Sequence, residues 1–275
     1  MFYKYTPIMY PQYIFIVLVG CLFAQNAAVP TSRIVHGNIA AKYQFPWHVS
    51  LTISYANSSH RSYCGGSLIS SRYVLTAASC LLNAVSIKAD FGSISFSTPL
   101  QSQITTKGML HPQFQPKNNA NNIAILQLNE DVWYTNDKRA ILLAGQSQAS
   151  NAFINTTSYI SGFGVAQNGD SYLSDNMRYA FTTVISNDVC QHFFPSSYVR
   201  SETMCTMGYI NSLQSACYGD QGGALVTNIG GTWYQIGLIS TIHGVGCTGN
   251  NPNLYTRITP YIQWINQMTG IAINP

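Results

Sequence analysis

The sequence predicts an all-β fold, and three observations lead to that class. Short apolar stretches rich in β-branched and aromatic residues recur along most of the chain, separated by clusters of Gly, Asn and Pro. Only one stretch, after Pro260, carries apolar residues at helical spacing. Hydrophobic residues make up 46% of the 275 residues, enough to bury a sizeable core. Many short strands with frequent turns are typical of a β barrel or sandwich.

The first expected strand covers residues 47–54, where apolar and polar residues alternate strictly, as in a strand with one buried face. His48 falls on the polar face, so we expect a solvated side chain there rather than a catalytic base. Further strands are expected at 67–69, 73–76, 85–91, 123–128, 157–161, 179–185, 224–227, 234–239 and 254–257. The last element is a C-terminal helix, in which Tyr261, Ile262, Trp264, Ile265 and Met268 have helical spacing.

Composition and charge exclude two classes of protein. Charged residues are only 8% of the chain, and Asn, Ser, Thr and Gln supply the polar surface instead. This pattern argues against disorder, which requires high charge and few apolar residues. The net charge is +4, and no run of like charge occurs. We therefore expect no nucleic-acid partner.

The N-terminal segment has the features of a secretory signal peptide. An apolar run over 13–24 follows Lys4 and precedes small residues. A membrane anchor is the alternative, but the run is shorter than the roughly 20 residues that span a bilayer. The sequence predicts a signal peptide at 1–24, a short propeptide at 25–33 and one domain at 34–275. The protein is thus expected to be secreted and extracellular, without a membrane partner.

The cysteine count fits an oxidising compartment. Cys21 leaves with the signal peptide, and an even number of six cysteines remains, as expected for disulfides. Six cysteines allow 15 pairings, among which the sequence alone does not choose. Asn57 and Asn155 each begin an Asn-x-Ser/Thr motif, so glycosylation is expected there. No His/Cys/Asp cluster has metal-ligand spacing, and no cofactor is expected.

Several separated motifs resemble the trypsin/chymotrypsin family of serine proteases. They are Cys64-Gly-Gly-Ser-Leu-Ile69, Val74-Leu-Thr-Ala-Ala-Ser-Cys80, Asn122-Ile-Ala124, Ser161-Gly-Phe-Gly164, Gly237-Leu-Ile-Ser-Thr241, Leu254-Tyr-Thr-Arg-Ile258 and Ala216-Cys-Tyr-Gly-Asp-Gln-Gly-Gly-Ala224. The resemblance covers about Ile34 to Ile271, and its spacing is most similar to arthropod chymotrypsin-like and collagenase-like members. It implies two packed six-stranded antiparallel β barrels with the active site between them. It also implies the disulfides Cys64–Cys80, Cys190–Cys205 and Cys217–Cys247.

All three positions of the family's catalytic triad are substituted. The resemblance places Ser79 at the histidine position, Asn122 at the aspartate position and Gln221 at the nucleophile. The backbone of Gly219 and Gln221 matches the loop that binds the substrate's carbonyl oxygen. A carboxamide is a very poor nucleophile, and none of the three side chains titrates near pH 7. The substitutions therefore predict that the chain is not an enzyme.

No other histidine offers a replacement base in the sequence. His36, His60 and His192 are assigned to segments remote from the cleft, and His111 stands in a turn that the family carries elsewhere. His243 is expected at the cleft edge, as a loop histidine without a nucleophile beside it.

The family's specificity pocket also differs here. Its base maps to Ser215 and its far wall to Asn253, so no preference for Lys or Arg is implied. Ile242 falls near the neck, where its branched side chain is expected to obstruct the pocket. A shift of the alignment would put Gly244 there instead.

The activation switch of the family is retained in the sequence. Cleavage after Arg33 would free Ile34, whose ammonium would pair with Asp220. A buried carboxylate is costly unless paired, so the joint presence of these residues supports the pair. The alternative is an incidental Arg-Ile and an Asp220 that is merely hydrogen-bonded.

These observations lead to one functional expectation and two alternatives. We expect a secreted serine protease homologue that acts by binding, as a cofactor, decoy or regulator of active proteases or of another extracellular ligand. Its expected partners are an extracellular protein or active protease and an activating trypsin-like protease. One alternative is an extracellular structural or reproductive-fluid protein without a protease partner, and the other is an active serine endopeptidase.

Overall fold

The computed structural model describes residues 37–165, 172–209, 213–243, 247 and 251–273. The chain divides into a short unit, 1–31, and a large unit, 32–275, to which every described residue belongs. The predicted signal peptide and propeptide, with Arg33, Ile34 and His36, therefore lie outside the described residues, as does Gly244. Within the described part, no helix has the length and apolar character that crossing a membrane requires.

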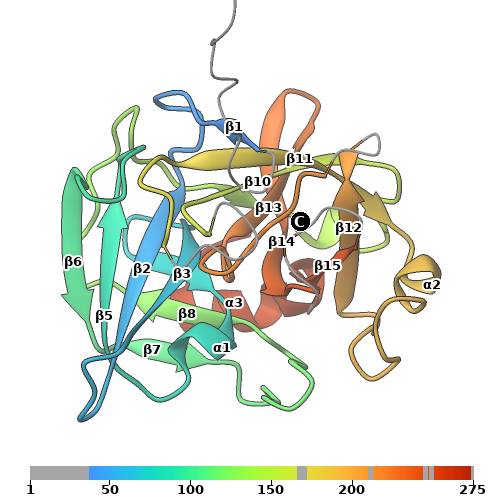
Figure 1. Ribbon diagram of the computed structural model, residues 1–275, viewed down its shortest axis with the longest axis horizontal. Coiled ribbons are helices and arrows are strands. Elements are labelled where there is room, and N and C mark those ends of the chain that lie inside the picture. The colour runs from blue at the N-terminus through green and yellow to red at the C-terminus, as the bar shows by residue number, and fades with distance from the viewer. Residues whose placement is uncertain (1–36, 166–171, 210–212, 244–246, 248–250, 274–275) are drawn as a thin grey trace, which may run out of the picture. The chain divides into compact units, whose positions relative to one another are not determined.

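The first sheet has the strand order β6-β5-β2-β3-β4-β8-β7, and its pairings are antiparallel. Its strands are β2 (His48–Tyr55), β3 (Arg61–Leu68), β4 (Tyr73–Thr76), β5 (Ala84–Phe91), β6 (Gln101–Thr105), β7 (Gly108–Leu110) and β8 (Ala124–Gln127). The edge strands β6 and β7 follow each other in the chain after a bend at 106–107. Counted as one bent strand, they join the two edges into a six-stranded barrel (Figure 1).

The second sheet closes into a ring. Its strands are β1 (Asn38–Ile39), β9 (Leu142–Leu143), β10 (Thr157–Gly162), β11 (Arg178–Ile185), β12 (Thr203–Gly208), β13 (Ala224–Ile229), β14 (Thr232–Thr241) and β15 (Asn253–Arg257). The antiparallel order β11-β10-β13-β14-β15-β12 returns to β11 through a β11–β12 pairing, and β1 and β9 add at its sides. The prediction of an all-β fold with two antiparallel barrels is confirmed.

Strand β2 alternates apolar and polar residues, which predicts one buried and one exposed face, but its polar face is not exposed at His48. Val49, Leu51 and Ile53 are fully buried, as their spacing predicts. His48, on the opposite face, is only 5% exposed. The end of β10, in the second barrel, covers the His48 side chain. The ring of Phe163 lies 5.5 Å from the imidazole, centroid to centroid, and Ser161 Oγ lies 3.4 Å from His48 Nδ1. The prediction of a solvated His48 is therefore wrong.

Short helices sit at the ends of the strands. They are α1 (Ala78–Leu81), the 3-10 turn η1 (Gln146–Gln148), α2 (Asn187–Cys190), the 3-10 turn η3 (Thr259–Tyr261) and α3 (Ile262–Thr269). The predicted C-terminal helix is α3, which ends at the left-handed Gly270 (φ 70°). Ile265 of α3 is fully buried, and the ring of Trp264 lies 5.0 Å from that of His111 next to β7, so the helix contacts the first barrel.

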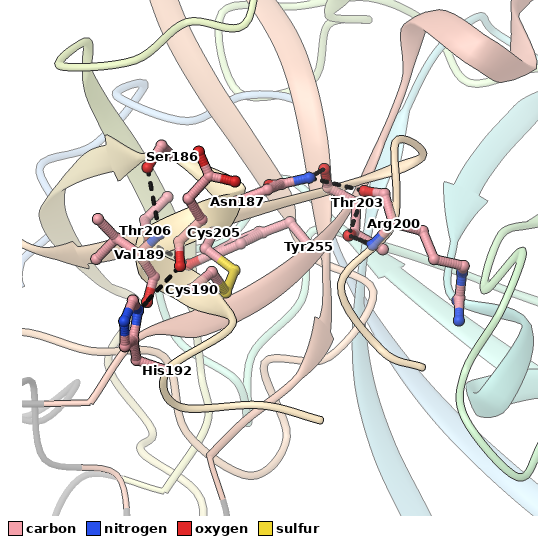
Figure 2. Close-up of a disulfide and its surroundings, with 11 residues drawn as sticks. Ser186, Asn187, Val189, Cys190, His192, Arg200, Thr203, Cys205, Thr206 and Tyr255 are labelled. Atoms are coloured by element: carbon pink, nitrogen blue, oxygen red, sulfur yellow. Dashed lines mark hydrogen bonds between the residues drawn. A yellow bond between two sulfur atoms is a disulfide. The ribbon is translucent and has the colours of Figure 1, made fainter. Parts of the chain in front are cut away.

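Three disulfides brace the loops, joining the pairs that the resemblance implies: Cys64–Cys80, Cys190–Cys205 and Cys217–Cys247. Figure 2 shows how the second of them fixes α2 against β12. Ser186 caps α2 by accepting the Val189 N–H, and the Asn187 amide donates to the Arg200 carbonyl at 2.8 Å.

Candidate active site

Ser79 and Asn122 lie against each other, although the sequence separates them by most of the first barrel. Ser79 belongs to α1, and Asn122 lies just before β8. The Asn122 amide oxygen accepts the Ser79 N–H at 2.8 Å, and its NH2 group donates to Ser79 Oγ at 3.1 Å and to Ser240 Oγ at 3.0 Å. Asn122 is fully buried. A neutral amide thus joins neutral hydroxyls where the family has an aspartate and a histidine.

Gln221 lies in the turn before β13 and folds back on its own loop. Its side-chain oxygen Oε1 accepts the Gly219 N–H at 2.9 Å. Its backbone oxygen accepts the Gly65 N–H of β3 at 2.7 Å and lies 3.6 Å from the Cys80 sulfur. The Gln221 carboxamide therefore takes a backbone donor that the resemblance assigns to a substrate carbonyl.

Two glycines shape this loop, and Gly222 is the one that faces the first barrel. Gly222 has φ +81°, and a Cβ there would lie 2.2 Å from Thr76 Oγ1. Gly219 has φ +97°, and a Cβ there would lie 2.7 Å from the Leu173 side chain. Both positions require glycine, because an L side chain would be strained and crowded by its neighbours. The loop is thus held where Gln221 and Ser79 border the same space.

That space is a cavity of about 860 Å³. Its lining comes from both barrels: Tyr55, His60, Arg61, Ser62, Tyr63, Cys64, Ser79, Cys80, Phe96, Val165, Tyr172, Leu173, Tyr218, Gly219 and Gln221. Aromatic rings are prominent, Arg61 is cationic, and these residues include no carboxylate. We call this space the cleft. His60 is part of it, so its assignment to a segment remote from the cleft is wrong.

Asp220 is buried directly behind the loop. Its carboxylate accepts the Gly164 N–H at 2.8 Å and the Cys217 N–H at 2.9 Å. Burial raises the pKa of Asp220 to about 6, although these two backbone hydrogen bonds lower it. Ile34, the expected cationic partner, is not among the described residues, so the activation pair stays a prediction.

The three residues that the resemblance assigns to the specificity pocket are buried. Asn253 donates to Ser215 Oγ at 2.8 Å, and each residue is 4% exposed. Ile242 is 9% exposed and belongs to a core cluster with Ala216 and Cys247. None of these residues lines the cleft.

Three other described histidines do not line the cleft. Burial lowers the pKa of His48 to about 4, and its ring contacts the Ser161 hydroxyl and the ring of Phe163. His111 packs edge-on against Tyr261 and Trp264, and His243 packs against Phe194. No group of three or more His, Cys, Asp or Glu side chains gathers as metal ligands among the residues described.

Aromatic cleft residues are what the sequence reasoning missed. Tyr63 and Phe96 meet edge to face with centroids 5.8 Å apart, and Tyr218 is 52% exposed beside them in the lining. The sequence motifs identify the positions of the family's catalytic residues, but they do not identify the loops that line the cleft. Only the position of Tyr218 next to Gly219 gave a signal that could have found it.

Two barrels with these three positions between them define the class as a trypsin-like serine protease fold. A family model described as Trypsin matches residues 34–265. The chain belongs to the trypsin family.

The relatives support this assignment across most of the chain. Collagenase from Hypoderma lineatum is 32% identical over 240 residues, which cover 87% of this chain and 88% of the relative. Human transmembrane protease serine 11A is 34% identical, over 87% of this chain and 56% of the relative, so the chain spans about half of that protein. The solved structure of HL collagenase has a TM-score of 0.78 at 30% identity, covering 86% of this chain and 99% of the other.

These comparisons correct one prediction. The substituted triad led to the expectation that the chain is not an enzyme, but its relatives are named as a collagenase and as transmembrane serine proteases. The comparisons contradict that expectation. The three substitutions are a property of the site. By themselves they do not show that the chain lacks enzymatic activity.

Proposed function

We propose that the chain is a secreted protein of the trypsin family that acts by holding a peptide or protein segment in the cleft. It would serve as a cofactor, decoy or regulator of active proteases, or bind another extracellular ligand. The observation that carries the proposal is the hydrogen bond from Gly219 N–H to Gln221 Oε1 at 2.9 Å, at the edge of an 860 Å³ cavity. The position of the family's nucleophile is occupied here by Gln221, whose carboxamide is suited to hydrogen bonding rather than to attack on a substrate.

The dimensions and lining of the cleft support binding. Cavities of about 300 to 1,000 Å³ with aromatic walls and a few polar groups are typical of ligand sites. Tyr63, Phe96 and Tyr218 offer apolar area with little conformational entropy to lose, and such residues often dominate the binding energy of an interface. The polar groups of Ser79 and Gln221 line the same space, where they would fix the register of a bound segment.

Proteolysis is the second candidate, and the names of the relatives favour it. A collagenase 32% identical over 87% of the chain makes peptide-bond hydrolysis the natural alternative. The two candidates share a site and differ in what happens to the bound segment.

One experiment separates them. The full chain, before and after cleavage behind Arg33, is incubated with a randomised peptide library. Retained peptides are sequenced, and new peptide ends are counted by mass spectrometry. The proposal predicts a retained set with a shared motif and no growth of new ends over time. A steady, enzyme-dependent growth of new ends at a preferred residue would favour proteolysis instead.

A further inference from the structure

A second cavity of about 510 Å³ lies apart from the cleft and shares none of its lining residues. It is formed where η1 and the loop after it meet the end of β15 and the start of α3. The side chains around it are mostly small or polar: Gln146, Ser150, Asn151, Ser201, Thr259 and Gln263. The sequence motifs give this region no role.

Arg257 is the one charged residue in the lining of this cavity. It is the last residue of β15, and its backbone is fixed because its N–H donates to the Glu202 carbonyl at 2.9 Å. Its guanidinium donates from Nη1 to the Asn151 carbonyl at 3.2 Å. The salt bridges found among the described residues do not include Arg257. Glu202 lines a different cavity, together with Arg200.

The placement of this guanidinium favours an anion. Burial lowers the pKa of Arg257, but an arginine side chain stays charged in proteins. A guanidinium has five N–H donors in a planar fork that matches the oxygens of carboxylate, sulfate or phosphate. No described carboxylate forms a salt bridge with this half-buried cation, and such a group gains most from a ligand that supplies both charge and acceptors.

We propose that this cavity binds a small hydrophilic ligand carrying one oxyanion group, with Arg257 as the residue that recognises that group. The cavity is larger than a single ion requires, since ligand sites start at about 300 Å³. The amides and hydroxyls of Gln146, Ser150 and Gln263 are the groups available to the rest of the ligand.

The test titrates the full chain with sodium acetate, sodium sulfate and sodium phosphate, with sodium chloride at matched ionic strength as the reference. Binding is followed by backbone amide shifts of residues 146–152 and 257–263 and by the melting temperature. We expect saturable shifts in these residues with at least one of the three salts. Acetate alone would identify a carboxylate ligand, and sulfate or phosphate a tetrahedral one.

Matched variants locate the effect. Arg257→Gln should weaken the response at least about tenfold, the size of one charge-assisted pair. Arg139→Gln removes the same charge from an exposed arginine outside this cavity and should leave the response unchanged. If Arg257→Gln does not fold, Arg257→Lys keeps the charge without the planar fork and should give an intermediate loss. No saturable shift with any salt, or equal loss in the Arg139 variant, would overturn the proposal.

Discussion

At the residue scale, Gln221 changes what the loop offers to a ligand. Its carboxamide oxygen and the Gly219 N–H form a hydrogen bond within three residues of chain. A ligand that needs the same donor must displace the side chain first, and the lost hydrogen bond is worth about 0.5–1.5 kcal/mol. The side chain that replaces the nucleophile thus also acts as an internal competitor.

Replacing Gln221 with methionine should expose that donor. Gln221→Met has a similar length but only a weak acceptor, so the Gly219 amide should lose its partner. We expect its hydrogen exchange to become at least about twofold faster, which corresponds to the lower end of the free energy of one hydrogen bond. Gln221→Glu keeps an oxygen acceptor and serves as the control. Unchanged exchange of Gly219 in the methionine variant would show that the side chain does not hold this donor.

At the element scale, the loop before β13 depends on the buried Asp220. Its carboxylate ties Gly164 to Cys217, and burial raises its pKa to about 6 from the ordinary 3.8. Between about pH 4 and 6 the folded chain therefore holds a proton that the unfolded chain has released. Stability falls as pH rises through this window and is flat above it.

Cleavage after Arg33 should reverse this dependence. An ammonium of Ile34 beside Asp220 would favour the charged carboxylate and lower its pKa. The cut protein should then lose stability as pH falls from the unfolded pKa of 3.8 towards the lowered folded pKa, by on the order of 2 kcal/mol for one to two units of pKa. Urea unfolding of the uncut and cut forms between about pH 2 and 7 measures both slopes.

Asp220→Asn is the control for that measurement, because it removes the titrating group in both forms. His48 titrates in the same pH range in each protein. Its contribution to the unfolding free energy therefore cancels when two proteins are compared at the same pH. The contrary result is that the cut and uncut forms show the same dependence of unfolding free energy on pH, each differing equally from the variant. That result would mean that Ile34 does not reach Asp220.

The elements also show what sequence patterns can predict. Two strands were located to within a residue or so: β5, in which apolar and polar residues alternate, and β11, which ends in four consecutive β-branched residues. β12 was missed because Thr203–Gly208 is rich in Met and Thr and carries a cysteine, without alternation. β6 was missed because Gln101–Thr105 is mostly polar and partly exposed. Tertiary pairing, and not local preference, makes these segments strands.

At the scale of the whole molecule, the two barrels bring the three triad positions together. Ser79 and Asn122 come from the first barrel and Gln221 from the loop before β13 of the second. Motif order predicts this gathering, since each motif has a fixed place in the family. The walls of the cleft come partly from the loop 56–60 and the strand ends beside it, and the length and sequence of that loop carry no periodic pattern. The cover over His48 likewise exists only after the barrels pack.

Restoring the triad tests whether the geometry between the barrels is still suited to catalysis. The triple variant Ser79→His, Asn122→Asp, Gln221→Ser should raise kcat/KM on peptide substrates over the wild type by at least about 10³-fold, because the three groups act as a unit. Gln221→Ser alone should give little of this gain. The control replaces Gln221 with Ala in the otherwise restored protein. A single change that equals the triple variant would show that a base other than residue 79 operates.

The most direct test of the binding proposal is a calorimetric titration of the wild-type chain with a peptide retained from the library. Two variants accompany it, Tyr218→Ala in the cleft and Tyr134→Ala outside it, with side chains of similar exposure, 52% and 50%. The account predicts one peptide bound per chain, at least about fivefold weaker binding for Tyr218→Ala, and unchanged binding for Tyr134→Ala. Binding that ignores the Tyr218 change, or a peptide recovered as two fragments after many turnovers, would contradict it.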